Sequence, residues 1–157
     1  MIDEINILTQ EISKVCPIEG LSQNGKSYII HFAGTSDENQ RIAAQYILDN
    51  KESIVSKYDK LEKLDNDFQA DLNAGYTSSY GWKLGLQNND VLLLSSLFLL
   101  AKTCHDNNLP LPEVIDTDGN AHALDIDALT VLMLQYGSYR ANLSKTYSEQ
   151  KKAIENI

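Results

Sequence analysis

The stretch DVLLLSSLFLLAKTCHDNN, residues 90–108, sets the expectation for the fold. Between Val91 and Ala101 it is apolar except for two serines, so its hydrophobic side chains cover a helix almost all round. Such a helix is typical of a protein interior, and the run is shorter than the ~20 apolar residues that a membrane span requires. The sequence therefore predicts a central buried helix over residues 90–106.

Polar and proline-containing segments bound this helix. Asn88 or Asn89 is a suitable N-cap residue, and the prolines of LPLP (109–112) cannot continue a helix. The preceding stretch YGWKLGL (80–86) alternates as a strand does. This alternation predicts three apolar side chains on one face of a strand, namely Trp82, Leu84 and Leu86.

The stretch VIDTDGNAHAL (114–124) has two aspartates, a glycine and a histidine close together, as in a metal loop. A calcium loop of the EF-hand kind needs glycine at its sixth position. Counted from Asp116, glycine falls at the fourth position, so the spacing fails. A zinc site needs three or four ligands, and only His122 is a good one. We therefore predict a hairpin turn at 116–120, with a weak cation site as the alternative.

The residues after this turn predict one long helix that continues to the end of the sequence. Asp125 can cap it, and only Gly137 weakens the pattern. The side chains expected on its buried face are Ile126, Leu129, Leu132, Met133, Tyr136, Arg140, Leu143, Tyr147 and Ile154.

Residues 1–50 predict a small unit in which two helices flank a hairpin. Apolar residues at spacings of three and four indicate an amphipathic helix over 3–16. The stretch GLSQNGKSYIIHFA (20–33) predicts the hairpin. There, Asn24 and Gly25 would supply the positive φ angles of a tight turn.

A second helix is expected over about residues 36–49, because Thr35 followed by Glu38 forms a capping box. The predicted fold class is therefore α+β, in three parts. These are a small α-β-β-α N-terminal unit (1–50), an amphipathic connecting helix (51–74), and a helix-rich C-terminal unit with a strand and a β-hairpin (75–157).

The connecting helix over 51–74 has one apolar stripe, and charged residues fill its other face. An isolated helix is marginal in water, so the stripe must be buried. The unit before it has few large apolar residues to spare. We therefore predict a homo-oligomer or a complex with another protein, with this stripe in the interface. The candidate interface residues are Ile54, Tyr58, Leu61, Phe68 and Leu72.

Composition narrows the classes of function. The chain has 13 Lys and Arg against 22 Asp and Glu, a net charge of -9. No run of basic residues exists, which argues against nucleic-acid binding. No apolar run predicts membrane insertion, and the start MIDEINILTQ lacks the features of a secretory signal. We therefore expect synthesis in a reducing cytoplasm, with Cys16 and Cys104 as buried thiols.

No motif in the sequence indicates catalysis. Gly-x-Ser-x-Gly, His-Glu-x-x-His and P-loop patterns are absent, so we predict no catalytic, cofactor-binding or metal-binding residues. His31 fits a solvent-facing strand position, and His105 fits a helix end. Tyr76, Tyr80 and Trp82 could stack on a sugar, or they could form a sheet face that packs on the core.

Residues 73–157 resemble an uncharacterised domain found in proteins encoded among the tail genes of tailed bacteriophages and prophages. The segments that carry the resemblance are GWKLGLQNNDVLLLSSLFLLAK, LPLPEVIDTDGNAHAL and LMLQYGSYRANLS. CPIEGLS and FAGTSDENQRIAAQYIL also resemble the front half of small proteins from the same gene neighbourhood.

This resemblance implies a protein associated with the tail fibre or its attachment. The expected function is a non-enzymatic structural or adaptor component of the virion tail. Its partners would be other phage tail proteins, either the fibre or the tail tube or adaptor, and it would carry no cofactor. A tail-fibre assembly chaperone is the alternative, and an enzyme acting on cell-surface glycans is a third hypothesis.

Overall fold

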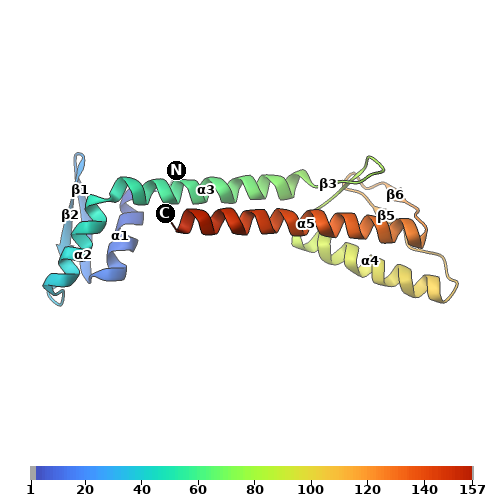
Figure 1. The fold of residues 1–157 in the computed structure, drawn as a ribbon, viewed down its shortest axis with the longest axis horizontal. Coiled ribbons are helices and arrows are strands. Elements are labelled where there is room, and N and C mark those ends of the chain that lie inside the picture. The colour runs from blue at the N-terminus through green and yellow to red at the C-terminus, as the bar shows by residue number, and fades with distance from the viewer. Residues whose placement is uncertain (1–2, 157) are drawn as a thin grey trace. The chain divides into compact units, whose positions relative to one another are not determined.

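A computed structural model describes residues 3–156, which form two compact units (Figure 1). Unit 1 comprises the residues up to Lys63 together with those from Ala153 onward, and unit 2 comprises Leu64–Lys152. The division between the units lies inside helix α3 (Lys51–Ala74), whereas the sequence suggested divisions at both ends of that helix. Helices and small antiparallel sheets make up both units, which confirms the predicted α+β class.

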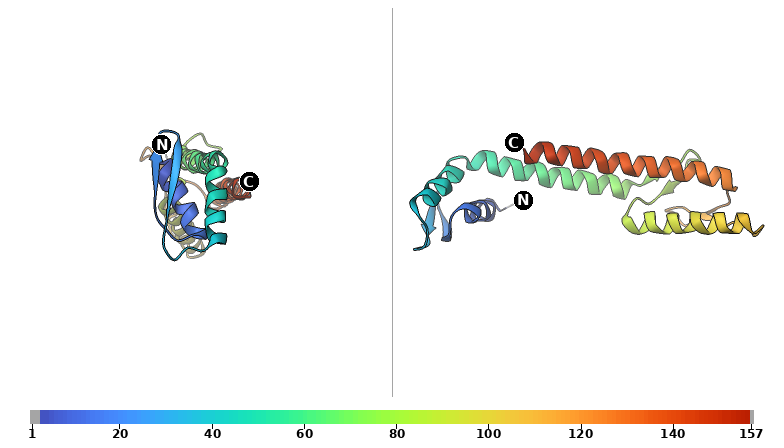
Figure 2. Two further views of the ribbon diagram at one scale, coloured as in Figure 1. Left: turned by 90° about the vertical axis from the view of Figure 1, so that its left-hand side faces the viewer. Right: turned by 60° about the horizontal axis from the view of Figure 1, so that its bottom comes forward.

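Unit 1 has the predicted α-β-β-α order. Its elements are α1 (Glu4–Val15), β1 (Ile18–Asn24), β2 (Ser27–Phe32) and α2 (Glu38–Asp49), followed by the first part of α3. The antiparallel hairpin lies against α1 (Figure 2). Its small core includes a cluster of Ile12, Cys16 and Ala44, with Ile18, Leu21, Ile30, Phe32 and Ile47 packed around them.

The hairpin turn lies one residue later than predicted. Asn24 is the last paired residue of β1 and faces Ser27, so the two turn residues are Gly25 and Lys26. Of the two, only Gly25 has a positive φ, 64°. A glycine at the first of two turn positions is typical of a type II′ turn, which joins twisted strands well. Asn24 therefore needs no left-handed conformation.

The start of α2 also differs from the prediction. Asp37 is the N-cap residue, and its carboxylate accepts a hydrogen bond from the backbone N–H of Gln40 at 2.9 Å. The Gln40 side chain in turn accepts from the Asp37 N–H at 2.9 Å. The proposed Thr35–Glu38 box is wrong because Ser36 is buried and turns back to donate to the Ala33 carbonyl at 2.7 Å, which delays the helix.

Unit 2 is built around two hairpins and parts of three helices. After α3 come β3 (Tyr76–Thr77) paired with β4 (Lys83–Leu84), then α4 (Asn88–Asp106), β5 (Val114–Ile115) paired with β6 (Ala121–His122), and α5 (Ile126–Glu155). The predicted strand over 80–86 is thus only two residues long, although Leu84 and Leu86 are buried as expected. The core residues are Leu72, Leu84, Leu86, Leu94, Ala101, Val114, Leu129, Leu132 and Tyr136.

Helix α5 confirms its prediction closely. The Asp125 carboxylate accepts from the backbone N–H of Ala128 at 2.7 Å, as a helix cap does. All nine side chains expected on its buried face are buried or partly buried. Two of them also make polar contacts with the segment before α4. The Tyr136 hydroxyl donates to the Gly85 carbonyl at 2.8 Å, and Arg140 Nε donates to the Leu86 carbonyl at 3.1 Å.

The start of α4 differs from the prediction, whereas its end at Asp106 agrees with it. The N-cap residue is Gln87 instead of Asn88 or Asn89, and its backbone N–H donates to the Asp90 carboxylate at 2.9 Å. At the other end Asn108 has a φ of 54°, which allows the Leu109 N–H to reach the Cys104 carbonyl at 2.8 Å. This is a Schellman motif. The helix therefore ends before the prolines.

The prediction that α4 is a central buried helix is wrong. Among its residues only Leu94 and Ala101 are buried, while Leu93 is 70% exposed and Leu100 is 53% exposed. A helix is enclosed only where elements pack on several of its sides. Unit 2 covers α4 on one side alone, and Figures 1 and 2 show α4 at the edge of the unit with no element beyond it.

Gly75 ends α3, as predicted, and its substitution tests the packing at this junction. It has a φ of 77°, and a Cβ added there would lie 2.7 Å from the Leu84 carbonyl oxygen. Gly119 has a similar φ of 85° but open space around it. We predict that Gly119→Ala lowers the free energy of unfolding by about 1 kcal/mol, the cost of the left-handed conformation. Gly75→Ala should cost clearly more, measured by urea unfolding.

Both substitutions carry the cost of the left-handed conformation. The difference between their losses of stability therefore measures the steric contact between the added Cβ of residue 75 and the Leu84 carbonyl oxygen of β4. Equal losses of stability would show that Gly75 is needed only for its φ angle.

Candidate functional site

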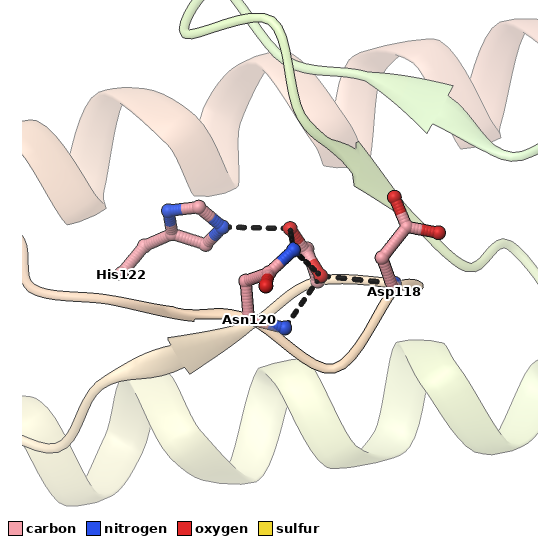
Figure 3. Close-up of polar contacts among 4 residues, drawn as sticks. Asp118, Asn120 and His122 are labelled. Atoms are coloured by element: carbon pink, nitrogen blue, oxygen red, sulfur yellow. Dashed lines mark hydrogen bonds and ion pairs between the residues drawn. The ribbon is translucent and has the colours of Figure 1, made fainter.

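The turn at 116–120 is organised by the side chain of Asp116, which is 8% exposed (Figure 3). Its carboxylate accepts hydrogen bonds from the backbone N–H groups of Asp118 at 2.9 Å and Asn120 at 2.8 Å. The Asn120 side-chain amide also donates to it, and His122 Nε2 lies 2.8 Å from its Oδ2. The Asp116 carboxylate therefore accepts hydrogen bonds from the residues of its own turn and stabilises that turn.

These donors hold the pKa of the Asp116 carboxyl well below its usual range. The hydrogen bond from His122 is the largest cause, burial opposes it, and the bonds from Asn120 and Asp118 add to it. The predicted hairpin turn is confirmed by the pairing of β5 with β6. Within residues 3–156 no group of three or more His, Cys, Asp or Glu side chains could hold a metal ion.

Aromatic rings extend from this turn toward the first hairpin of unit 2. His122 stacks on Trp82 with ring centroids 4.3 Å apart, and Tyr80 stacks on Trp82 at 5.8 Å. Tyr76 instead packs against Tyr136 and Tyr139 of α5. The rings that the sequence suggested as a sugar platform are thus largely engaged with one another and with the core. Tyr80, 49% exposed, presents the most open ring.

The five residues predicted for an interface lie on α3, and none of them is fully exposed. Leu72 is buried in the core of unit 2, and Phe68 stacks on Tyr147 at 4.4 Å. The Tyr58 hydroxyl donates to the Glu11 carboxylate, while Ile54 and Leu61 are partly buried. The stripe is therefore at least partly covered within a single chain, and its role between chains stays a prediction.

The remaining candidates have local structural roles. Cys16 is buried and Cys104 is partly buried. His31 lies exposed on β2 with its Nε2 2.8 Å from the Ser22 hydroxyl, and His105 is exposed in the last turn of α4. These positions agree with the sequence interpretation of both histidines.

The most distinctive surface is the outer side of α4. Leu92, Leu93, Leu99 and Leu100 are 65%, 70%, 68% and 53% exposed, respectively. Seven residues make about two helical turns, so Leu92 lies above Leu99 and Leu93 above Leu100. Ser96, also exposed, lies midway between the two pairs. We call these five residues the leucine face. It lies opposite the buried side chains of Leu94 and Ala101.

An open hollow of about 400 Å³ continues this surface toward β5. It is lined chiefly by apolar side chains, including Leu93, Leu94 and Leu97 of α4 and Val114 and Ile115 of β5. Leu93 belongs to both the hollow and the leucine face. The apolar surface therefore runs from the outer side of α4 across to the edge of the second hairpin.

Folded proteins rarely leave large contiguous apolar surfaces exposed to water, and such surfaces often mark contacts with other molecules. This surface was not predicted from the sequence, because an apolar pattern all round a helix is typical of a buried helix. A usable signal was present: leucine pairs repeat after seven residues around Ser95 and Ser96, as on a helix that contacts another helix along one side.

Comparison with protein-family models, with curated proteins and with solved structures finds no significant match to this chain. Within residues 3–156, no helix has the length and apolar character needed to cross a bilayer. The candidate site is therefore defined by geometry alone: it consists of the leucine face of α4 and the hollow beside it.

The role of Asp116 in the turn can be tested against Asp118, whose side chain is exposed. We predict that Asp116→Asn lowers the melting temperature at pH 7 by several degrees, whereas Asp118→Asn changes it little. Because the folded-state pKa of Asp116 is lowered, its stabilisation is complete above the unfolded-state pKa of about 3.9 and is lost as the pH falls further. The gap between wild type and Asp116→Asn, followed by circular dichroism, should shrink below about pH 4.

Millimolar calcium should leave all three melting temperatures unchanged, because the Asp116 carboxylate is occupied by its own turn. A calcium-dependent rise in the wild type that Asp118→Asn abolishes would instead indicate a cation site.

Proposed function

We propose that this chain is a non-enzymatic structural or adaptor protein of a bacteriophage tail, held in the particle by protein contacts made through the leucine face. The observation that carries the contact role is the exposure of four leucines on one side of α4, at 53–70% each. Burying a leucine fully contributes roughly 1.5–3 kcal/mol, so covering this surface would strongly favour assembly.

The polar side chains of the second hairpin favour a structural role over a catalytic one. A general acid of a glycoside hydrolase needs a carboxyl whose pKa is raised. The pKa of Asp116 is lowered instead, and its carboxylate is saturated by hydrogen bonds from the turn. Trp82 is stacked with its neighbours, which leaves little ring surface for a sugar.

The assignment to a phage tail rests on the resemblance of residues 73–157. That resemblance includes DVLLLSSLFLLAK, the segment that contains the whole leucine face. The resemblance is to a domain that recurs among tail genes, and the leucine face of this chain is uncovered. Both features fit a tail component whose leucine face is covered by other tail proteins in the particle. The virion is accordingly the proposed location, and other tail proteins are the proposed partners.

The test is mass spectrometry of purified particles of the phage that encodes the chain. We predict that the protein is present at a fixed copy number per particle. Its absence from particles, with recovery bound to tail fibre in the lysate, would replace the structural role with that of an assembly chaperone. Absence from both would contradict the proposal.

The leucine face can be tested in the same particles. We predict that Leu93→Asp combined with Leu100→Asp removes the protein from particles, because two charges would have to be buried at the contact. Leu134→Asp is the matched control, since Leu134 is a leucine of α5 that is 67% exposed. Equal effects of both variants would show that α4 is not the contact helix.

A further inference from the structure

We propose that the leucine face binds a second copy of this chain, with the two α4 helices antiparallel around a twofold axis that passes beside Ser96. The inference deepens the proposed function, on which it rests, by naming the partner of its contact surface. It does not use the α3 stripe predicted from the sequence.

The arrangement of the leucines is what points to a second copy. A twofold contact requires a surface that is complementary to itself. If residue i of one copy meets residue j of the other, then residue j of the first copy also meets residue i of the second. Leu92 and Leu93 lie before Ser96, and Leu99 and Leu100 lie after it. In an antiparallel pair centred on Ser96, Leu92 therefore meets Leu99 of the second copy, and Leu93 meets Leu100.

The small residues along the centre of the face allow the helices to approach closely. Asn89, Ser96 and Thr103 are spaced by seven residues, so they form one line between the leucines, and all three are exposed. Helix axes approach to about 8 Å where contact residues are small. The two Ser96 side chains would then lie next to each other at the axis.

Charge also favours this pairing over a parallel one. Each copy has a net charge of -9, yet the residues from Val91 to Ala101 include no charged side chain, so two copies can meet there without placing like charges in contact. An antiparallel pair opposes the helix dipoles and brings the end with Asp90 toward the end with Lys102. A parallel pair would align the helix dipoles. It would also bring the two Asp90 side chains toward each other, and likewise the two Lys102 side chains.

The hollow beside Leu93 gives the second copy a further contact. Its lining includes Leu93, Leu97 and Ile115, and it is partly open to solvent. Leu100 of the second copy, which meets Leu93, would cover its rim, and the twofold axis repeats this contact in the other copy. The surface is thus covered by residues that the chain itself supplies.

The expected affinity is modest. Helix α4 has 19 residues, so it is about 28 Å long and, with side chains, about 10 Å wide. This footprint is smaller than the roughly 800 Å² per partner of a standard interface. We therefore expect a Kd on the order of 10 µM, and a dimer of about 35 kDa, twice 17.5 kDa, in light scattering at about 300 µM.

Light scattering of variants gives the first test. Leu93→Asp with Leu100→Asp should leave almost only monomer at about 300 µM, which requires a loss of affinity of about a thousandfold, because the twofold contact would bury four charges, two from each copy. The helix should still fold, because both side chains are already exposed in the single chain. Leu134→Asp should dimerise like wild type.

Cross-linking gives the second test and fixes the direction of the helices. In a Cys104→Ser background, Ser96→Cys should oxidise to a disulfide-linked dimer. Ser95→Cys, an exposed serine pointing about 100° away around the helix, should not. An equimolar mixture of Asn89→Cys and Thr103→Cys chains should form the mixed disulfide, whereas neither chain alone should cross-link.

A wild type that stays monomeric at about 300 µM, or equal cross-linking at Ser95 and Ser96, would overturn the twofold contact. Cross-linking of Asn89→Cys alone would overturn the antiparallel direction. A monomeric protein that is still present in particles would leave the proposed function standing, with another tail protein on the leucine face.

Discussion

Helix α4 is covered on one side only, and much of the behaviour inferred for this chain depends on that constraint. The segment before α4 is fixed to α5 by the hydrogen bonds of Tyr136 and Arg140 to the carbonyls of Gly85 and Leu86. The inner side of α4, with Leu94 and Ala101, contributes to the core of unit 2. No further helix or strand of the unit reaches its outer side, so leucines of an apolar segment remain in solvent.

The second hairpin shapes the surface beside α4. Asp116 closes the turn between β5 and β6, and His122 joins the carboxylate to the ring of Trp82. These contacts hold Val114 in the core and Ile115 at the rim of the hollow beside α4. A cluster that resembles a metal loop in sequence thus shapes the edge of an apolar surface.

The features that were predicted correctly from the sequence are those determined by residues close together in the chain. The long helices α3 and α5 were predicted well, because apolar periodicity and the stop at Gly75 are local signals. The N-caps of α2 and α4 and the hairpin turn were displaced by one or two residues, since several polar residues compete for each cap. The burial of α4 could not be predicted from its own residues, because it depends on how many other elements reach it. The same pattern of leucines suits a core helix and a contact helix.

The central claim is that the outer side of α4 is a contact surface for a second copy. Hydrogen–deuterium exchange of the wild-type protein, compared at about 1 µM and about 300 µM, tests it most directly. The account predicts slower exchange of the α4 amides at the higher concentration, with the amides of α1 and α2 unchanged. Exchange in α4 that is independent of concentration would contradict the account.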